Sequence, residues 1–294
     1  MPITAPVFRD ELMLLIGKGK VSNLSKILFV NDGSKDKTWE IICDFAKSDK
    51  HFCGISQSRN RGHQNALLAG LMEVKDRCDI AISIDCDGQD DVCAMEAMVD
   101  AYAQGCDIVY GVRSDRKTDS FPKRFFARSY YKLQRAMKIE SIYDHADYRL
   151  TSSRVLKSLA DFGEVNLYLR GMFPIIGFKS TTIPYTRGKR LAGKTHYPLK
   201  KMLSLAIDGI TGFSLAPIRL IFALGAAITL AGIISLIVLA ASLSSSAAGW
   251  IIAAMAVFFG ITILCIGVIG EYIGKTYLET KKRPRYIVSE RTEE

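Results

Sequence analysis

Two aspartates separated by a single residue, Asp85 and Asp87, follow directly on the apolar segment of DIAISIDCDGQDD, residues 79–91. Carboxylates crowded at the end of a strand repel one another unless a cation neutralises them. A small number of hard oxygen ligands suits Mg²⁺ or Mn²⁺ that also binds the phosphates of a substrate. We therefore predict that these two aspartates are metal ligands. The plainer alternative is an acidic turn in contact with solvent.

A second motif, VNDGSKDKT at residues 30–38, places Asp32, Gly33 and Ser34 at an expected strand-to-helix turn. Glycine permits a tight turn, and a serine or aspartate side chain can cap the helix that follows. Helix capping alone is a sufficient explanation of this motif. The Asp32 carboxylate can also accept hydrogen bonds from a nucleotide base or a ribose, so both interpretations stay open.

The third motif, SRNRGHQNALLAG at residues 58–70, brings Arg59 and Asn60 to the end of the next expected strand, ahead of a helix. Arginines meet phosphates well, and the N-terminus of a helix favours anions. We expect these side chains on the nucleotide side of a site. His63, in the same motif, is more often structural than catalytic when taken by itself.

The elements that position these motifs alternate between strand and helix. We expect strands over 26–31, 54–58, 79–85 and 107–113, and helices over 37–47, 65–74 and 92–105. This alternation predicts an α/β sandwich around a mostly parallel sheet, with helix and loop continuing to about residue 200. In such sheets ligands bind beyond the carboxyl ends of the strands, where all three motifs fall.

The last third of the chain has a different character. No Asp, Glu, Lys or Arg occurs between Arg219 and Glu271. This stretch contains two apolar runs, about 220–241 and 250–270, each long enough to cross a bilayer core of about 30 Å as a helix. We predict a transmembrane hairpin over 218–274 rather than a buried helical hairpin.

The segments around that hairpin complete the expected organisation. The catalytic domain is expected over 1–199, an amphipathic segment at the membrane interface over 200–217, and a basic tail over 275–294. Basic residues flank both ends of the hairpin and the loop between its helices is uncharged. The positive-inside rule then places both termini and the catalytic domain in the cytoplasm, on the inner membrane.

The net charge of +9 favours an anionic partner, such as a phosphorylated substrate, a membrane surface or nucleic acid. The seven cysteines form no CxxC pair and no metal-finger spacing. They are most simply free thiols of a reducing compartment.

Taken together, the motifs resemble family 2 glycosyltransferases of the GT-A fold, a Rossmann-like α/β fold with a mixed sheet. The closest likeness is to the polyprenyl-phosphate glycosyltransferases, and it covers nearly the whole chain. NDGSKDKT, RNRGHQNALLAG and DCDGQDD are similar to the family's nucleotide and metal motifs. Farther on, DHADYRL (144–150), RGKRLAGKTHYPLKK (187–201) and IGEYIGKTYLETKKRPRYIV (269–288) are similar to its later blocks.

The resemblance implies an inverting transfer of a sugar from a nucleotide diphosphate to polyprenyl phosphate, with Mg²⁺ or Mn²⁺. It implies catalytic roles for Asp90, Asp147 and Arg149, although orienting roles, or an Asp147–Arg149 ion pair, are alternatives. It also implies that Asp85, with the nucleotide motifs, contacts the nucleotide sugar. The acceptor phosphate is expected at Arg113, Arg190 and Lys194, the last two of which a lipid-headgroup anchor would also explain.

Several points stay open in the sequence. UDP-glucose is the donor that the resemblance favours, ahead of GlcNAc and mannose donors, and a tetramer is a family possibility. A run of hydrophobic residues followed by Asp-x-Asp-Gly, here ending at Gly88, also resembles the first motif of haloacid-dehalogenase-type phosphatases. In that family, however, the motif lies near the N-terminus. The family's first strand, which ends in a Pro-x-Tyr/Cys-Asn-Glu motif, has no counterpart here. We therefore also weigh an inactive, membrane-anchored scaffold, or a synthase that elongates a polysaccharide.

Overall fold

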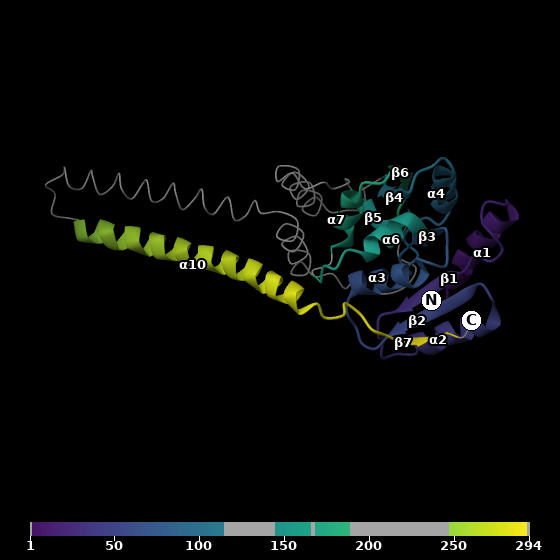
Figure 1. Ribbon diagram of the computed structural model, residues 1–294, viewed down its shortest axis with the longest axis horizontal. Helices are drawn as coiled ribbons and strands as arrows, with labels where there is room; N and C mark the ends of the chain where they lie inside the picture. The colour runs from purple at the N-terminus through teal and green to yellow at the C-terminus, as the bar shows by residue number, and fades with distance from the viewer. Residues whose placement is uncertain (1, 115–144, 166–167, 189–246, 293–294) are drawn as a thin grey trace.

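A computed structural model of the chain describes residues 2–114, 145–165, 168–188 and 247–292 (Figure 1). The elements alternate as the sequence predicts, and the four expected strands and three expected helices are confirmed within three residues at each end. In chain order they are α1 (Thr4–Gly17), β1 (Ile27–Asn31), α2 (Thr38–Ser48), β2 (Phe52–Gln57), α3 (His63–Val74), β3 (Ile80–Ser83), α4 (Ala94–Ala103) and β4 (Ile108–Arg113). These are followed by β5 (His145–Ser152), α6 (Ser153–Ala160), α7 (Leu169–Ile176), β6 (Ser180–Tyr185), α10 (Ala247–Lys281) and β7 (Val288–Arg291).

The described strands form two sheets, with the orders β1-β2-β7 and β3-β5-β4-β6. β1 pairs with β2 and β4 pairs with β6 in parallel, whereas the other three pairings are antiparallel. The expectation of a mostly parallel sheet was therefore wrong, while the mixed sheet of the GT-A resemblance agrees with the structure. Among the described residues, β1 and β3 each pair along one edge only, and α3 packs against both of them.

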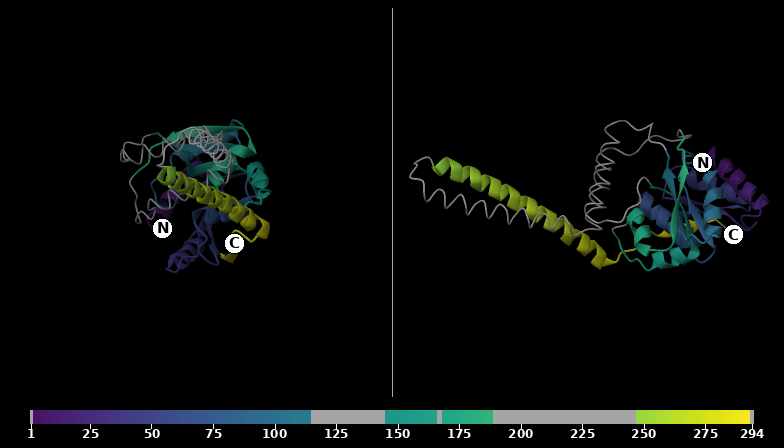
Figure 2. Two further views of the ribbon diagram at one scale, coloured as in Figure 1. Left: turned by 90° about the vertical axis from the view of Figure 1, so that its left-hand side faces the viewer. Right: turned by 90° about the horizontal axis from the view of Figure 1, so that it is seen from above.

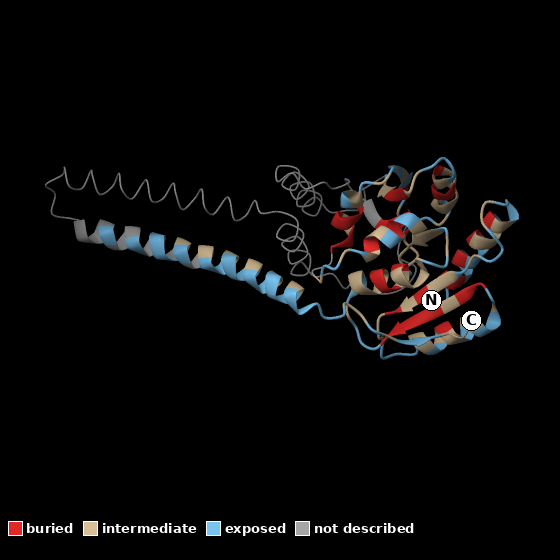
Figure 3. Cartoon of the chain, viewed as in Figure 1, coloured by how far each residue is buried: buried red, intermediate tan, exposed pale blue. Residues whose placement is uncertain are grey.

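The core follows the two-residue period of β4 and β5. On β4, Ile108 and Tyr110 pack with α3, α6 and α7, whereas Val109 between them packs with α4 on the opposite face. On β5, Tyr148 and Leu150 share the α4 face. This alternation places residue 149, an arginine, on the face of the sheet that α7 covers. Figure 3 shows these buried strands and helices in red.

The expectation that helix and loop alone fill residues 114–200 was wrong, because β5 and β6 lie within that range. β5 is an internal strand between β3 and β4, and it includes most of the DHADYRL block. Its polar residues concealed its alternation in the sequence. Pro184 in β6 similarly argues against a strand when read from the sequence alone.

The C-terminal part consists of a long helix and a returning strand. α10 projects away from the α/β domain, and the chain then comes back so that β7 lies beside β2 (Figures 1 and 2). The return is held by Arg291, whose Nε and Nη2 each lie 2.9 Å from the Glu73 carboxylate, and by the Trp39 indole, which donates to Glu290 at 2.9 Å. The end of the basic tail is thus a third strand of the first sheet.

A search of the described helices for one long and apolar enough to cross a membrane finds none. The predicted transmembrane hairpin is therefore not supported by the described residues. Its second run falls within α10, and its first run, like the interfacial segment 200–217, lies outside the described residues.

Candidate active site

The nucleotide motif forms a tight turn that is locked to the neighbouring loop. The Asp32 carboxylate accepts the backbone N–H groups of Arg61 at 2.8 Å and Gly62 at 3.0 Å. Gly33 has φ +60°, and a Cβ there would lie 2.5 Å from the backbone carbonyl carbon of Arg59. Ser34 donates its N–H to the side chain of Asn31 at 3.2 Å. Asp32 thus joins the loops after β1 and β2, Gly33 permits their close approach, and Ser34 closes the turn onto β1.

The loop after β2 carries Arg59 and Asn60 at the surface beside that turn. The Asn60 side-chain oxygen accepts the N–H of Gly62 at 3.1 Å, which fixes the entry into α3. The structure brings both predicted residues to the carboxyl ends of β1 and β2, the edge at which the sequence predicts a nucleotide site.

The acidic loop begins directly after β3. Asp87 accepts the backbone N–H of Gln89 at 3.1 Å, which closes the turn. Gln89 in turn bonds to Gly188, accepting its N–H at 2.7 Å. The loop is therefore tied to the segment after β6. A cavity of about 300 Å³ adjoins it, lined by Gly88–Val92 and by the N-terminal part of α1, among others.

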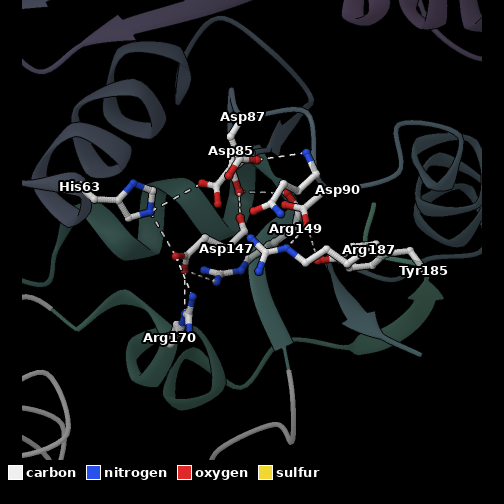
Figure 4. Close-up of polar contacts among 11 residues, drawn as sticks. His63, Asp85, Asp87, Asp90, Asp147, Arg149, Arg170, Tyr185 and Arg187 are labelled. Atoms are coloured by element: carbon white, nitrogen blue, oxygen red, sulfur yellow. Dashed lines mark hydrogen bonds and ion pairs between the residues drawn. The ribbon is translucent and has the colours of Figure 1, made fainter. Parts of the chain in front are cut away.

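Asp90 lies buried at the end of this loop. The Tyr185 hydroxyl donates to its Oδ1 at 2.7 Å, and Nε of Arg187 is 3.6 Å from the same oxygen (Figure 4). Arg113 ends β4 directly opposite Tyr185 in the register of the sheet. Burial and the contact with Asp90 raise the pKa of Tyr185, so its hydroxyl remains a donor at neutral pH.

Asp147, on β5, is the centre of a second cluster. Arg170 of α7 contacts both of its oxygens, with Nε and Nη2 each at 3.0 Å, and His63 Nε2 lies 3.2 Å from Oδ2 (Figure 4). Nη2 of Arg149 is 3.7 Å from Oδ1. Burial alone would raise the pKa of Asp147, but Arg170, His63 and Arg149 outweigh burial and hold it well below its usual range.

Arg149 is the most enclosed member of that cluster. Its side chain is 1% exposed, and its guanidinium lies over the Phe173 ring at 4.0 Å and the Tyr110 ring at 5.7 Å. Burial lowers the pKa of Arg149 to about 10, although Asp147 opposes that shift. The geometry matches the ion-pair interpretation of Asp147 and Arg149, and Arg149 lies beneath the site.

His63 links the two clusters, since the same Nε2 is 3.9 Å from Oδ1 of Asp85. Burial raises the pKa of the Asp85 carboxyl; His63 opposes that shift, and Asp147, Asp90 and Asp87 add to it. Asp85, Asp90 and Asp147 therefore lie in one region, as the sequence predicts, and the neighbouring carboxylates disfavour ionisation of Asp85.

The aspartates of this region fit a divalent cation that takes further ligands from its substrate. No group of three or more His, Cys, Asp or Glu side chains in the described ranges is placed to hold a metal by itself. Mg²⁺ is commonly bound by one or two carboxylates, with waters and substrate phosphates completing the shell. Asp85 and Asp87 supply such a partial set, and a cation would relieve the repulsion at Asp85.

Two predicted acceptor residues, Arg190 and Lys194, lie outside the described residues. Three residues at the site were missing from the prediction: Arg170, Arg187 and Tyr185. His63 was interpreted as structural. Arg170 and Tyr185 belong to none of the quoted motifs, whereas His63 lies within SRNRGHQNALLAG. Arg187 alone stood inside a quoted basic block, which is the signal that could have found it.

Comparisons with known proteins agree with this architecture. The family model described as glycosyl transferase family 2 matches residues 22–159. The chain is 47% identical over 280 residues to an uncharacterised glycosyltransferase of Bacillus subtilis, YkoT, covering 93% of this chain and 82% of that protein. It is 35% identical over 299 residues to the prophage bactoprenol glucosyl transferase homolog of Escherichia coli, covering 97% of each.

A third relative, the bactoprenol glucosyl transferase of Shigella phage SfX, is 34% identical over an alignment of 314 residues that covers 98% of both chains. The region matched by the family model contains the turn at Asp32, the acidic loop, His63, Asp147 and Arg149. The chain therefore belongs to glycosyl transferase family 2 and is a glycosyltransferase.

Proposed function

We propose that this enzyme transfers glucose from UDP-glucose to undecaprenyl phosphate, with inversion at the anomeric carbon, to make a lipid-linked sugar for the cell envelope. The observation that carries the proposal is the match, over nearly the full length of both chains, to proteins named bactoprenol glucosyl transferases. The carboxylate site supports it, because a nucleotide diphosphate brought to Asp85 and Asp87 requires a cation between the charges.

The roles of the residues follow from their placement. The turn at Asp32 to Ser34 and the adjoining Arg59 and Asn60 would receive the nucleotide, since they form the carboxyl edge of β1 and β2. Asp85 and Asp87 would hold Mg²⁺ or Mn²⁺ against the diphosphate. That ion, when bound, stabilises the charge that develops on the leaving group.

The acceptor needs little help from a general base. A phosphate monoester has its second pKa near about 6, so it is largely a dianion at neutral pH and can attack without losing a proton. Asp147 is already ionised and shared with two arginines and His63. We assign Asp147 an orienting role, and we assign Asp90, held by Tyr185 and beside Arg187, to the sugar or acceptor.

We propose further that α10 and the uncharged run before it associate with the cytoplasmic membrane and leave the catalytic domain and both termini in the cytoplasm. Large apolar side chains of α10 are exposed, among them Phe258, Phe259, Ile266 and Ile273. A lipid acceptor would then lie beside the site, where Arg113, Arg190 and Lys194 are proposed to meet its phosphate. Whether copies of the chain assemble into a tetramer is left to measurement of its mass in detergent.

Within the part of the chain that the structure describes, β1 and β3 each pair along one edge only, and this supports one more proposal: an added strand between them would complete a single sheet. α3 already packs across both strands, and all four residues of β3 are only half-buried. Fusing a strand of alternating apolar residues to the N-terminus should raise the unfolding midpoint. A fusion of equal length rich in Gly and Ser should leave it unchanged, and equal midpoints would refute the proposal.

The proposed reaction is tested by incubating membranes that contain the full chain with undecaprenyl phosphate and, in parallel, UDP-glucose, UDP-GlcNAc or GDP-mannose. The lipid extract is then analysed by mass spectrometry. Lipid-linked hexose from UDP-glucose above the other two donors is expected. Product from another donor alone would replace the donor assignment, and no product from any of them would contradict the transfer.

A further inference from the structure

Arg170, in the Asp147 cluster, combines an orientation fixed by two hydrogen bonds with access from solvent. Its Nε and Nη2 both contact Asp147 at 3.0 Å, so the plane of the guanidinium is set by two parallel hydrogen bonds. The side chain is nevertheless 30% exposed, whereas Arg149 on the other side of the same carboxylate is 1% exposed. A ligand approaching this cluster meets Arg170 and not Arg149.

An arginine guanidinium carries its N–H donors in a rigid planar fork, and Nε and Nη2 of Arg170 contact Asp147. Arginine is the residue of choice for recognising phosphate, and an orientation fixed in advance lowers the entropy lost on binding. The same Asp147 is joined through His63 to Asp85. Arg170 is therefore connected through Asp147 and His63 to Asp85, one of the proposed metal ligands (Figure 4). The two anionic substrates must meet at these ligands.

We propose that Arg170 binds a phosphate oxygen of a substrate, and that Asp147 is the positioning residue that holds its guanidinium in place. The proposal deepens the function given above and rests on it for the identity of the substrates. The phosphate belongs either to the lipid monophosphate or to the nucleotide diphosphate. Arg170 recognises both by the same chemistry.

The test measures binding rather than turnover. The full chain in detergent is titrated calorimetrically with two probes, farnesyl phosphate and UDP in the presence of Mn²⁺. The Arg170→Gln variant is expected to weaken one probe on the order of tenfold, which corresponds to about 1.4 kcal/mol. The matched control is Arg77→Gln, at an arginine in the loop between α3 and β3 whose side chain is 59% exposed.

Two further variants distinguish a loss of phosphate binding from a loss of folding. Asp147→Asn should weaken the same probe as Arg170→Gln, because the guanidinium is then no longer held. Arg170→Lys keeps the charge without the paired hydrogen bonds and should weaken that probe about threefold. If Arg170→Gln does not fold, the lysine variant decides, and an unchanged affinity for both probes overturns the proposal.

Weaker farnesyl phosphate binding assigns Arg170 to the acceptor, and weaker UDP binding assigns it to the donor. Changes below twofold for both probes in a folded Arg170→Gln variant would overturn the proposal. This binding test is independent of the transfer assay. If the wild-type chain forms no lipid-linked sugar, the proposed function is contradicted. A loss of probe affinity in the Arg170→Gln variant would still support phosphate binding by Arg170.

Discussion

Replacing Asp147 by Asn tests the physical account of the second cluster, because it removes one charge and almost no volume. Arg149 would then remain fully buried without its carboxylate. In the wild type its pKa of about 10 keeps the guanidinium protonated at neutral pH, and the loss of the Asp147 carboxylate removes the contact that opposes the effect of burial. Removing one partner of a buried ion pair typically costs about 3–5 kcal/mol.

The lower end of that range applies here. The guanidinium keeps its contacts with the Phe173 and Tyr110 rings, each worth about 0.5–2 kcal/mol. We therefore expect the Asp147→Asn variant to lose about 3 kcal/mol of unfolding free energy, on the order of 150-fold in the equilibrium constant. The assay is urea unfolding of the full chain in detergent, followed by tryptophan fluorescence.

Two comparisons make this prediction specific. Asp85→Asn removes a half-exposed carboxylate among like charges, so its unfolding free energy should change by less than about 1 kcal/mol. Combining Asp147→Asn with Arg149→Met removes both charges, and most of the lost stability should return. A loss below about 1 kcal/mol for Asp147→Asn, or no recovery in the double variant, would refute the reasoning.

Three further predictions concern other parts of the chain. Gly33→Ala should lose at least about 1–2 kcal/mol of stability, because the residue has a positive φ and its Cβ would meet the backbone of Arg59; an unchanged urea midpoint would show that the turn relaxes. Deleting the chain from Val288 onward should lower the thermal midpoint, since the edge of β2 loses its partner; equal midpoints would mean that β7 adds no stability. The pKa of His63 is raised by its hydrogen bond to Asp147, so this contribution to stability is complete below the unfolded pKa of about 6.5 and is lost as pH rises through the folded value. The difference in unfolding free energy between wild type and His63→Gln should therefore shrink as pH rises above about 6.5, and a constant difference would contradict the pairing.

The sequence predicted those strands and helices whose apolar residues form a simple local pattern. β1 to β4 and the helices between them are short apolar runs bounded by polar turns, and the structure confirms them. β5 was missed because a charged residue, Arg149, occupies a buried position on one of its faces. The free-energy cost of burying the Arg149 charge is offset by contacts with Asp147 and two aromatic rings. None of these contacts can be inferred from the local sequence pattern.

The candidate site, like the fold, was predicted only where its residues follow a local sequence pattern. The spacing of carboxylates at a strand end predicted Asp85 and Asp87 as metal ligands, whereas Asp90 was predicted only from the family resemblance. Arg170 reaches Asp147 only because α7 packs against the sheet, a contact between residues 23 positions apart. Its role depends on tertiary packing, so no motif in the sequence indicates it.

The central claim is that the carboxylate site transfers a sugar to a lipid phosphate. The most direct measurement follows label from UDP-glucose into undecaprenyl phosphate in membranes containing the chain, with Mn²⁺ or with EDTA, for wild type and for Asp87→Ala. We expect labelled lipid from the wild type with Mn²⁺, and almost none with EDTA or from the variant. Equal labelling by the variant, or labelling that persists in EDTA, would contradict it.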